Sequence, residues 1–208
     1  MDEEIPEITY DVGAAANAFN LSLGETLGHW ARVESFFMRH FALLTALEHK
    51  MARRLFYSAR SFQGRVDMLA AAAAASNAKD GHKAFVRAAI KKAREQSGFR
   101  NRLAHGETVF IAGSGTRYSG QYVLVEGKTD FDPFEDEAVT KAQLDTAGEN
   151  FHVLAGALLF ATMCDWGDAA SDPQGYLRLV RALPNQPHLH EPDPILVAEL
   201  LQPPPRPG

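Results

Sequence analysis

The fold is decided by the stretch "LGETLGHWARVESFFMRHFALLTALEHKMARRLFYSA" at residues 23–59. Its large apolar residues recur in steps of three and four, which is the spacing of one face of an α-helix. They are Leu23, Leu27, Trp30, Val33, Phe37, Phe41, Leu44 and Leu47. A stripe this wide and this rich in aromatic rings predicts a long amphipathic helix that packs against several other helices.

Three more helices are expected after this one. The alanine-rich segment "RVDMLAAAAAAS" at residues 65–76 favours a second helix, and either Ser58 or Ser61 could cap it. Apolar positions of helical spacing predict a third helix from residue 82 to about residue 98 or slightly beyond. The same pattern predicts a fourth over residues 137–165.

The periodicity changes after Gly106, which we expect to end the third helix in the C′ position that glycine often takes. Residues 109–112 and 121–125 are rich in β-formers and are separated by glycine, serine and threonine, which predicts a β-hairpin. The glycine-rich loop lacks the Gly-Lys-Ser/Thr ending of a nucleotide P-loop. The predicted fold is mainly α, a four- to five-helix up-and-down bundle. A β-hairpin at about 107–126 is inserted between the third and fourth core helices.

Composition divides the 208-residue chain into three parts. Residues 1–12 form an acidic N-terminus, residues 13–183 the helical domain, and residues 184–208 a proline-rich tail. No apolar run is long enough to span a bilayer, so we expect no membrane insertion. Cys164 is the only cysteine, which excludes an internal disulfide and favours a reducing cytoplasm.

Charge is unevenly distributed along the chain. Residues 82–105 hold seven lysines and arginines against one acid, Glu95, a charge of +6, so the remainder carries −11 to reach the net −5. A cationic helix on an acidic body attracts polyanions such as nucleic acid. The same charge run also fits a solvated helix face, and on charge alone that plainer interpretation is favoured.

The segment "GFRNRLAHGET" at residues 98–108 is the most distinctive motif. Asn101 and His105 are four residues apart and therefore share one face of a helix. Arg100 is five residues from His105, hence about 140° away around an ideal helix. Joint chemistry of Arg100 and His105 therefore requires a long side chain that wraps, a distorted helix end or a second copy of the chain.

Arg100, Asn101 and His105 in "RNRLAHG" resemble the motif of the HEPN superfamily, which is an arginine, a polar residue and a histidine after a short gap. The resemblance implies a bundle of four or five helices that often dimerises with its two motifs facing each other. Many members of the superfamily are metal-independent ribonucleases of toxin–antitoxin and antiviral systems. Others bind nucleotides or have lost catalysis.

The chemistry of the motif fits RNA cleavage. Histidine titrates near neutrality and can act as base or acid, while arginine stays charged and can hold a phosphate with two donors. Attack by a 2′-hydroxyl would give a 2′,3′-cyclic phosphate without a metal or cofactor. Arg100, Asn101 and His105 are the catalytic candidates. The substrate-binding candidates are Arg102, Lys91, Arg94 and Arg87. The expected partners are a second copy of the chain, RNA or a nucleotide, and an antitoxin-like protein.

Several alternatives remain open at this level. The motif also has the composition of a helix C-terminus, and the chain could be a non-catalytic bundle that binds RNA, a nucleotide or a protein. Glu34 and Arg65 either support the motif or face solvent. "HLHEPD" at residues 188–193 has metal-ligand types but lies in the proline-rich tail, so no metal site is expected there.

Overall fold

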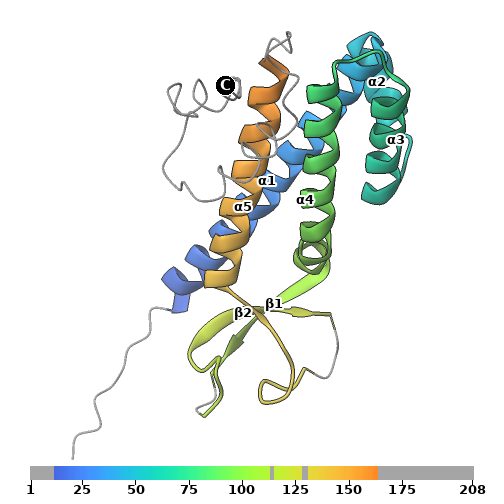
Figure 1. Ribbon diagram of the computed structural model, residues 1–208. Helices are drawn as coiled ribbons and strands as arrows, with labels where there is room; N and C mark the ends of the chain where they lie inside the picture. Colours follow the sequence, from blue (N-terminus) through green and yellow to red (C-terminus); the bar gives the residue numbers. More distant parts are fainter. Residues whose placement is uncertain (1–11, 113–114, 128–130, 164–208) are drawn as a thin grey trace, which may run out of the picture.

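The computed structural model describes residues 12–112, 115–127 and 131–163 of the chain (Figure 1). The described elements are, in order, α1 (Val12–Thr45), α2 (His49–Phe56), α3 (Phe62–Ala75), α4 (Asp80–His105), β1 (Gly106–Ile111), β2 (Gln121–Glu126), β3 (Val139–Thr140) and α5 (Lys141–Met163). The protein is mainly α-helical with one small antiparallel sheet, as expected. The sheet lies at one end of α1, α4 and α5, and α2 and α3 lie toward the other end (Figure 1).

The long amphipathic pattern is divided between two helices. Ala46 has a φ of 52°, in the left-handed region, and the chain turns there before Glu48 caps α2 by accepting a hydrogen bond from the backbone nitrogen of Lys50. The expected single helix over residues 23–59 is therefore wrong at this point. The turn folds α2 back onto α1, so that the rings of Phe41 and Phe56 lie 5.7 Å apart.

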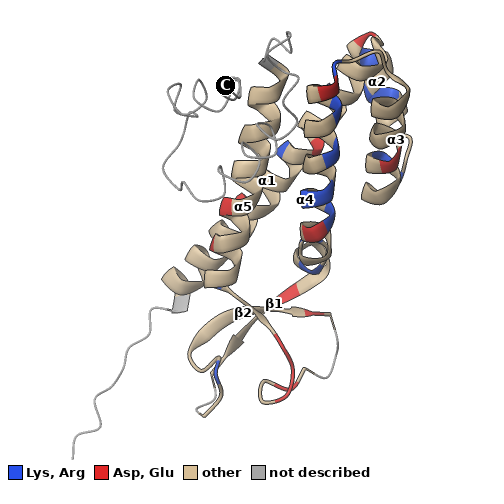
Figure 2. Ribbon diagram, in the orientation of Figure 1, with Lys and Arg blue, Asp and Glu red and all other residues tan. Residues whose placement is uncertain are grey.

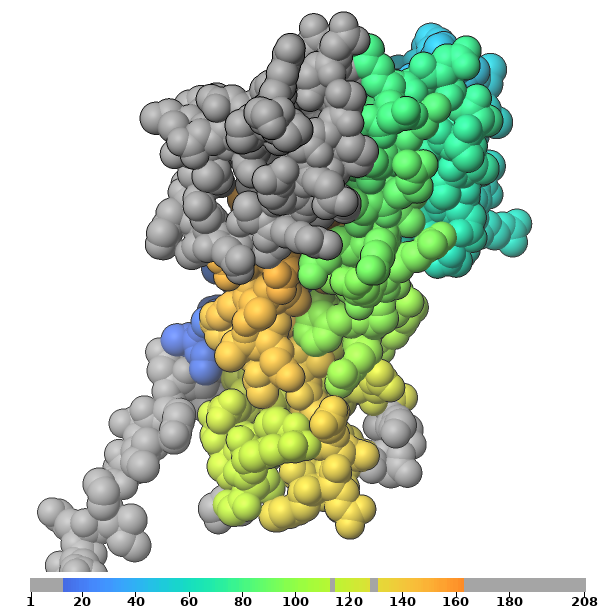
Figure 3. Space-filling view, viewed as in Figure 1, coloured from blue at the N-terminus to red at the C-terminus, as the bar shows by residue number. Residues whose placement is uncertain are grey.

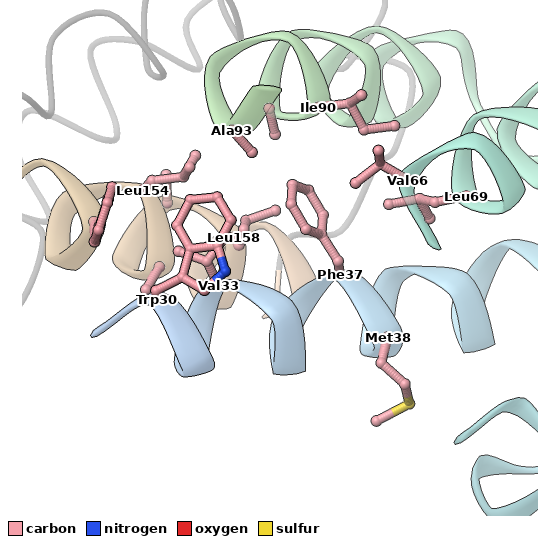
Figure 4. Packing of buried hydrophobic residues seen from close by; sticks show 14 of the residues in the cluster. Trp30, Val33, Phe37, Met38, Val66, Leu69, Ile90, Ala93, Leu154 and Leu158 are labelled. Atoms are coloured by element: carbon pink, nitrogen blue, oxygen red, sulfur yellow. The ribbon is translucent and has the colours of Figure 1, made fainter. Parts of the chain in front are cut away.

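The apolar face of α1 forms the centre of the core, and α1 contacts each of the other four helices of the described chain. Side chains from α1, α3, α4 and α5 meet there (Figure 4). Those labelled in the figure that point into this space are Trp30, Val33, Phe37, Val66, Leu69, Ile90, Ala93, Leu154 and Leu158, all of them buried. Burial of each large apolar side chain contributes roughly 1.5–3 kcal/mol, so this face holds the helices together.

The contact between α1 and α5 also has a polar seam. Thr26 Oγ1 donates to the carbonyl oxygens of Ser22 at 2.8 Å and Leu144 at 3.1 Å. His29 Nδ1 lies 2.9 Å from the carbonyl oxygen of Gly148. A Cβ at Gly148 would lie 2.8 Å from Thr26 Oγ1, so glycine is what allows the two helices to approach this closely.

Local signals explain where α3 and α5 begin. Ser61 caps α3, since its side chain accepts from the backbone nitrogen of Gly64, and this confirms one of the two expected caps. Gln143 Oε1 accepts from the backbone nitrogen of Thr140 at 2.9 Å, as in a capping box. Helix α5 therefore begins at Lys141, later than the expected residue 137, because the chain first forms β3.

Gly106 does not have the expected role. Its φ of −81° and ψ of 159° are extended, so it leads directly from α4 into β1 and is not a left-handed C′ residue. Gly106 is needed instead because its neighbours leave no room for a side chain. A Cβ at Gly106 would lie 2.4 Å from Leu124 Cδ2 and 2.9 Å from the carbonyl oxygen of Arg102, so any larger residue would collide with β2.

The expected hairpin is confirmed as part of a larger sheet. Strands β1 and β2 pair antiparallel, with Gly106 opposite Glu126 and Val109 opposite Val123. The short strand β3, which was not expected, pairs on the other side of β2, giving the order β1-β2-β3. Its pairing leads the chain from the sheet directly into α5.

No helix in the described ranges is long and apolar enough to cross a bilayer. Four of the features considered from the sequence lie outside the described residues: the acidic N-terminus up to residue 11, Cys164, the segment 188–193 and the proline-rich tail from residue 184.

Candidate functional site

Helix α4 presents a regular exposed stripe on the side away from the core. Arg87, Lys91, Arg94, Asn101 and His105 are all exposed and follow one another in helical steps, with Gly98 filling the remaining position. We call these six residues the α4 stripe. Lys and Arg gather along α4 in Figure 2. The motif residues Asn101 and His105 therefore form the end of a cationic surface that runs along the helix.

The cations along α4 differ in how far they are already neutralised. Arg87 and Lys91 form no ion pair with another described residue, whereas Arg94 Nη2 lies 2.5 Å from Asp67 Oδ1 on α3. Both Arg94 and Asp67 are exposed, so this pair is worth at most about 1 kcal/mol and can be exchanged for another anion. Arg87 and Lys91 are thus the stripe residues most available to phosphate.

Arg100 points in a different direction from the stripe. It lies seven residues after Ala93, which is buried in the core, so both side chains start from the inner face of α4. Its Nη2 atom is 3.9 Å from Glu34 Oε1 on α1, and 31% of its side chain is exposed. Helix α4 stays regular through His105, and no hydrogen bond or ion pair among the described residues joins Arg100 to His105.

Glu34 is the centre of a small cluster beneath Arg100. Its Oε1 accepts a 2.7 Å hydrogen bond from Trp30 Nε1, and its Oε2 is paired with Arg65 Nη1. Arg65 Nε also donates to the carbonyl oxygen of Ala59 at 3.1 Å, which fixes the guanidinium. Only 12% of the Glu34 side chain is exposed. One carboxylate against two guanidinium groups leaves this site with a charge of +1.

The Glu34 cluster reaches the surface through Arg100. Arg100 Nη1 donates to Asn101 Oδ1 at 3.3 Å, and Asn101 is exposed on the stripe. Arg100 Nε is buried and has no hydrogen-bond partner among the described residues. The fold leaves this one donor unused, but a phosphate can reach only the part of the guanidinium within the 31% of the side chain that is exposed.

Arg102 has acidic surroundings. Its Nε lies 3.3 Å from Glu126 Oε1 on β2, and the adjoining cavity of about 230 Å³ is also lined by Asp136 and Glu137. Three carboxylates around one arginine repel phosphate. Of the four substrate-binding candidates, Arg87 and Lys91 thus lie free on the stripe, Arg94 is paired at its edge, and Arg102 joins α4 to the sheet.

Buried histidines form a second polar cluster, inside the core. His40 Nδ1 lies 2.8 Å from His82 Nε2, and His40 Nε2 lies 3.0 Å from the carbonyl oxygen of Leu158. Because a carbonyl can only accept, His40 Nε2 carries the proton and Nδ1 accepts from His82. Burial lowers the pKa of His40 to about 3, with a further contribution from His82, and lowers the pKa of His82 to about 4. Both rings are therefore neutral at pH 7, and they join α1, α4 and α5.

The sequence leaves open whether Glu34 and Arg65 support the motif or face solvent, and it does not indicate the partner of Arg102. Glu34 carries a signal, since it is an acid between apolar positions of α1, but its pairing with Arg65 and Arg100 depends on how three helices meet. The pairing of Arg102 with Glu126 depends on the register of the hairpin. Within the described ranges, no group of three or more histidine, cysteine, aspartate or glutamate residues could hold a metal ion.

Comparison of the chain with protein-family models, with curated proteins and with solved structures gives no significant match.

Proposed function

We propose that the protein is a metal-independent ribonuclease of the HEPN type that acts as a homodimer in the cytoplasm. The α4 stripe binds single-stranded RNA. Asn101 and His105 at the end of the stripe, together with the neighbouring Arg100, cleave the RNA strand. The RNA 2′-hydroxyl attacks the neighbouring phosphorus, which releases a 5′-hydroxyl and leaves a 2′,3′-cyclic phosphate. Histidine moves the protons, and arginine stabilises the charge that develops on the phosphate oxygens.

The observation that carries this proposal is the position of Asn101 and His105 on the stripe. Both are exposed, and they continue the line of Arg87 and Lys91. A backbone bound along that line by its phosphates would bring one phosphodiester to His105. A helix face used only for solvation needs no such alignment of cations with a titratable group.

Arg100 supports the proposal through its contacts. It touches the exposed Asn101 on one side and the largely buried Glu34 on the other. Since Arg65 already neutralises Glu34, Arg100 can turn toward a phosphate without leaving the carboxylate unpaired. Glu34 and Arg65 would thus hold Arg100 beside the stripe in the absence of RNA.

A second copy of the chain completes the proposed site. Arg100 and His105 start from different faces of a regular helix, so one chain alone does not direct both at the same phosphate. Two copies that face each other at the ends of α4 would provide two histidines, one as base and one as acid. A toxin–antitoxin or defence setting follows from the resemblance, with an antitoxin-like protein as a partner that covers the stripe.

The proposal is tested with purified protein and single-stranded RNA in the presence of EDTA. We expect cleavage products that end in a cyclic phosphate, detected by mass spectrometry, and loss of at least 100-fold in rate for Arg100→Ala and His105→Ala. His49→Ala and Arg32→Ala change exposed residues outside the stripe and serve as matched controls. Activity that survives both motif substitutions would overturn the assignment.

One observation favours a second candidate, a non-catalytic bundle that binds RNA, a nucleotide or a protein. Arg94, Arg100 and Arg102 are each paired with a carboxylate of the same chain, as expected of arginines that stabilise a fold. This candidate predicts binding without cleavage. For a polyanionic ligand the affinity falls steeply with salt, whereas a protein complex dominated by apolar contacts is much less sensitive.

A further inference from the structure

A groove opens between α4 and α5 near the sheet. The two helices lie side by side in Figure 3. The volume of the groove is about 410 Å³, within the range of small-molecule sites in proteins. The lining consists of Glu95, Gln96, Phe99, Ala142, Gln143, Thr146, Ala147, Asn150 and Phe151. The groove therefore combines aromatic rings with carboxamide groups, and we call it the α4–α5 groove.

We propose that the α4–α5 groove binds an unpaired nucleobase of the RNA held on the α4 stripe. This inference rests on the proposed binding of RNA and adds a source of base preference to it. Sequence-specific recognition of RNA uses unstacked bases that lie on aromatic side chains and form hydrogen bonds along their edges. The groove supplies both kinds of contact.

The aromatic contact comes from two phenylalanines. Phe151 is buried and closes the bottom of the groove, and Phe99 is only partly buried. The alanines Ala142 and Ala147 add small apolar walls that leave room for a flat ring. An apolar slot with one accessible aromatic ring suits the face of a base.

The polar contact comes chiefly from Gln96. Its Oε1 atom is buried and has no hydrogen-bond partner among the described residues. A buried polar atom without a partner destabilises the fold, so a ligand donor that meets this oxygen once the side chain turns into the groove would remove a penalty that the protein now carries. The Gln143 oxygen already accepts from Thr140, which leaves Gln96, Asn150 and the Gln143 amide nitrogen to bind the edge of a base.

The groove lies next to the cationic stripe. Glu95 of the lining comes four residues after Lys91 of the stripe, which places them about 40° apart around the helix and roughly 6 Å apart along its axis. Glu95 is the one acid of the lining, and Lys92 Nζ lies 3.8 Å from its Oε2, so its repulsion of a phosphate is partly offset. A nucleotide whose base enters the groove can therefore keep its phosphate on α4.

The test compares four probes: adenosine, cytidine, guanosine and uridine. Each is titrated into the full chain while the side-chain amide signals of Gln96 and Asn150 are followed by NMR. Six-nucleotide homopolymers of the same four bases are measured in parallel by fluorescence anisotropy. We expect one base to shift the Gln96 signal and to bind about 10-fold more tightly than the weakest base in the homopolymer series.

Two substitutions in the groove sharpen the test. Gln96→Leu removes the carboxamide at similar volume. We expect it to reduce the ratio between the strongest and the weakest of the four binding affinities by about 10-fold. Phe99→Leu removes the ring and should weaken all four roughly 5- to 10-fold. Gln121→Leu makes the same change as Gln96→Leu at an exposed position on β2 and should leave the base preference unaltered.

The outcomes separate this inference from the proposed function. Nucleoside binding in the groove without RNA cleavage supports the groove and counts against the ribonuclease. RNA binding with the same base preference in wild type and Gln96→Leu overturns the groove and leaves the ribonuclease intact. Loss of dimerisation in Phe99→Leu with unchanged affinity for all four bases also overturns it and identifies the groove as a contact between chains. No response to nucleosides or RNA overturns both.

Discussion

Arg100 on α4 and Glu34 on α1 face each other across the helix interface, with Arg100 Nη2 3.9 Å from Glu34 Oε1. Glu34 binds Arg65 much more closely, and Trp30 donates to the same carboxylate. The motif arginine is thus the looser partner of a carboxylate that is already neutralised. This arrangement ties the motif to the core and keeps the guanidinium beside the exposed face of α4.

Glu34→Gln is expected to destabilise the protein. The substitution leaves two guanidinium groups next to each other without the carboxylate, and loss of one partner of a largely buried ion pair costs roughly 2–4 kcal/mol after allowance for partial exposure. Urea unfolding measures the effect as a lower midpoint. Glu25→Gln, at an exposed position of the same helix, should change the free energy of unfolding by less than about 0.5 kcal/mol. Equal effects of the two substitutions would contradict a special role for Glu34.

Stability is expected to fall as the pH decreases from about 6.5. The folded-state pKa values of His40 and His82 lie below the usual 6.5, at about 3 and about 4, so the unfolded chain binds protons more readily between these values and 6.5. Each such histidine lowers the free energy of unfolding by up to about 1.4 kcal/mol per pH unit, and this loss ends below the folded pKa.

Urea unfolding at pH 7.5, 6.0 and 5.0 tests this pH dependence before most carboxylates titrate. His82→Gln should reduce the slope of the free energy of unfolding against pH by up to about 1.4 kcal/mol per pH unit, which corresponds to one proton. The reason is that the substitution removes one histidine whose pKa is lowered in the folded state. His49 is exposed on α2, and His49→Gln should retain the wild-type slope. A slope that is the same in all three proteins would show that the buried pair is not the source.

Gly106→Ala is expected to destabilise the junction of α4 and β1. The added Cβ would collide with Leu124 Cδ2, at 2.4 Å, and with the carbonyl oxygen of Arg102, so the strand must shift at a cost of roughly 1–3 kcal/mol. Gly24 has nothing within 4 Å of the same position. Gly24→Ala should therefore stabilise α1 by about 0.5–1 kcal/mol.

A double-mutant cycle checks the cause of the Gly106 effect. In a Leu124→Ala background the collision with the side chain is removed, and Gly106→Ala should cost less than in the wild type. Additive effects, measured by thermal or urea unfolding, would show that Leu124 is not the obstacle.

The four cationic candidates are expected to contribute unequally to RNA affinity. Arg87→Ala and Lys91→Ala should each lower the slope of log K against log salt by about 0.7, the value for one phosphate contact on a single strand. Arg102→Ala should change the slope little, because Glu126 already neutralises this arginine. Arg94→Ala should change the slope by an intermediate amount, because Arg94 can readily exchange its exposed ion pair with Asp67 for a contact with a phosphate. Anisotropy titrations at several salt concentrations measure the slopes, and equal slopes for all four variants would refute this ranking.

Much of the fold follows from the sequence by itself. Apolar residues at helical spacing determine the core face of α1, because a helix whose one face is apolar must bury it. The change to β-formers after Gly106 determines the hairpin, and Ser61 determines the start of α3. The common face of Asn101 and His105, and the different direction of Arg100, follow from helix geometry alone.

Only the tertiary structure decides how these parts meet. The break at Ala46, the pairing of β3 and the glycine at position 106 each depend on contacts between segments far apart in the chain. The ion pairs of Arg100 with Glu34 and of Arg102 with Glu126 do so as well. Local spacing says which side of a helix a residue occupies. Which charge it meets there is set by the packing of other elements, because electrostatic and steric contacts act across space and not along the sequence.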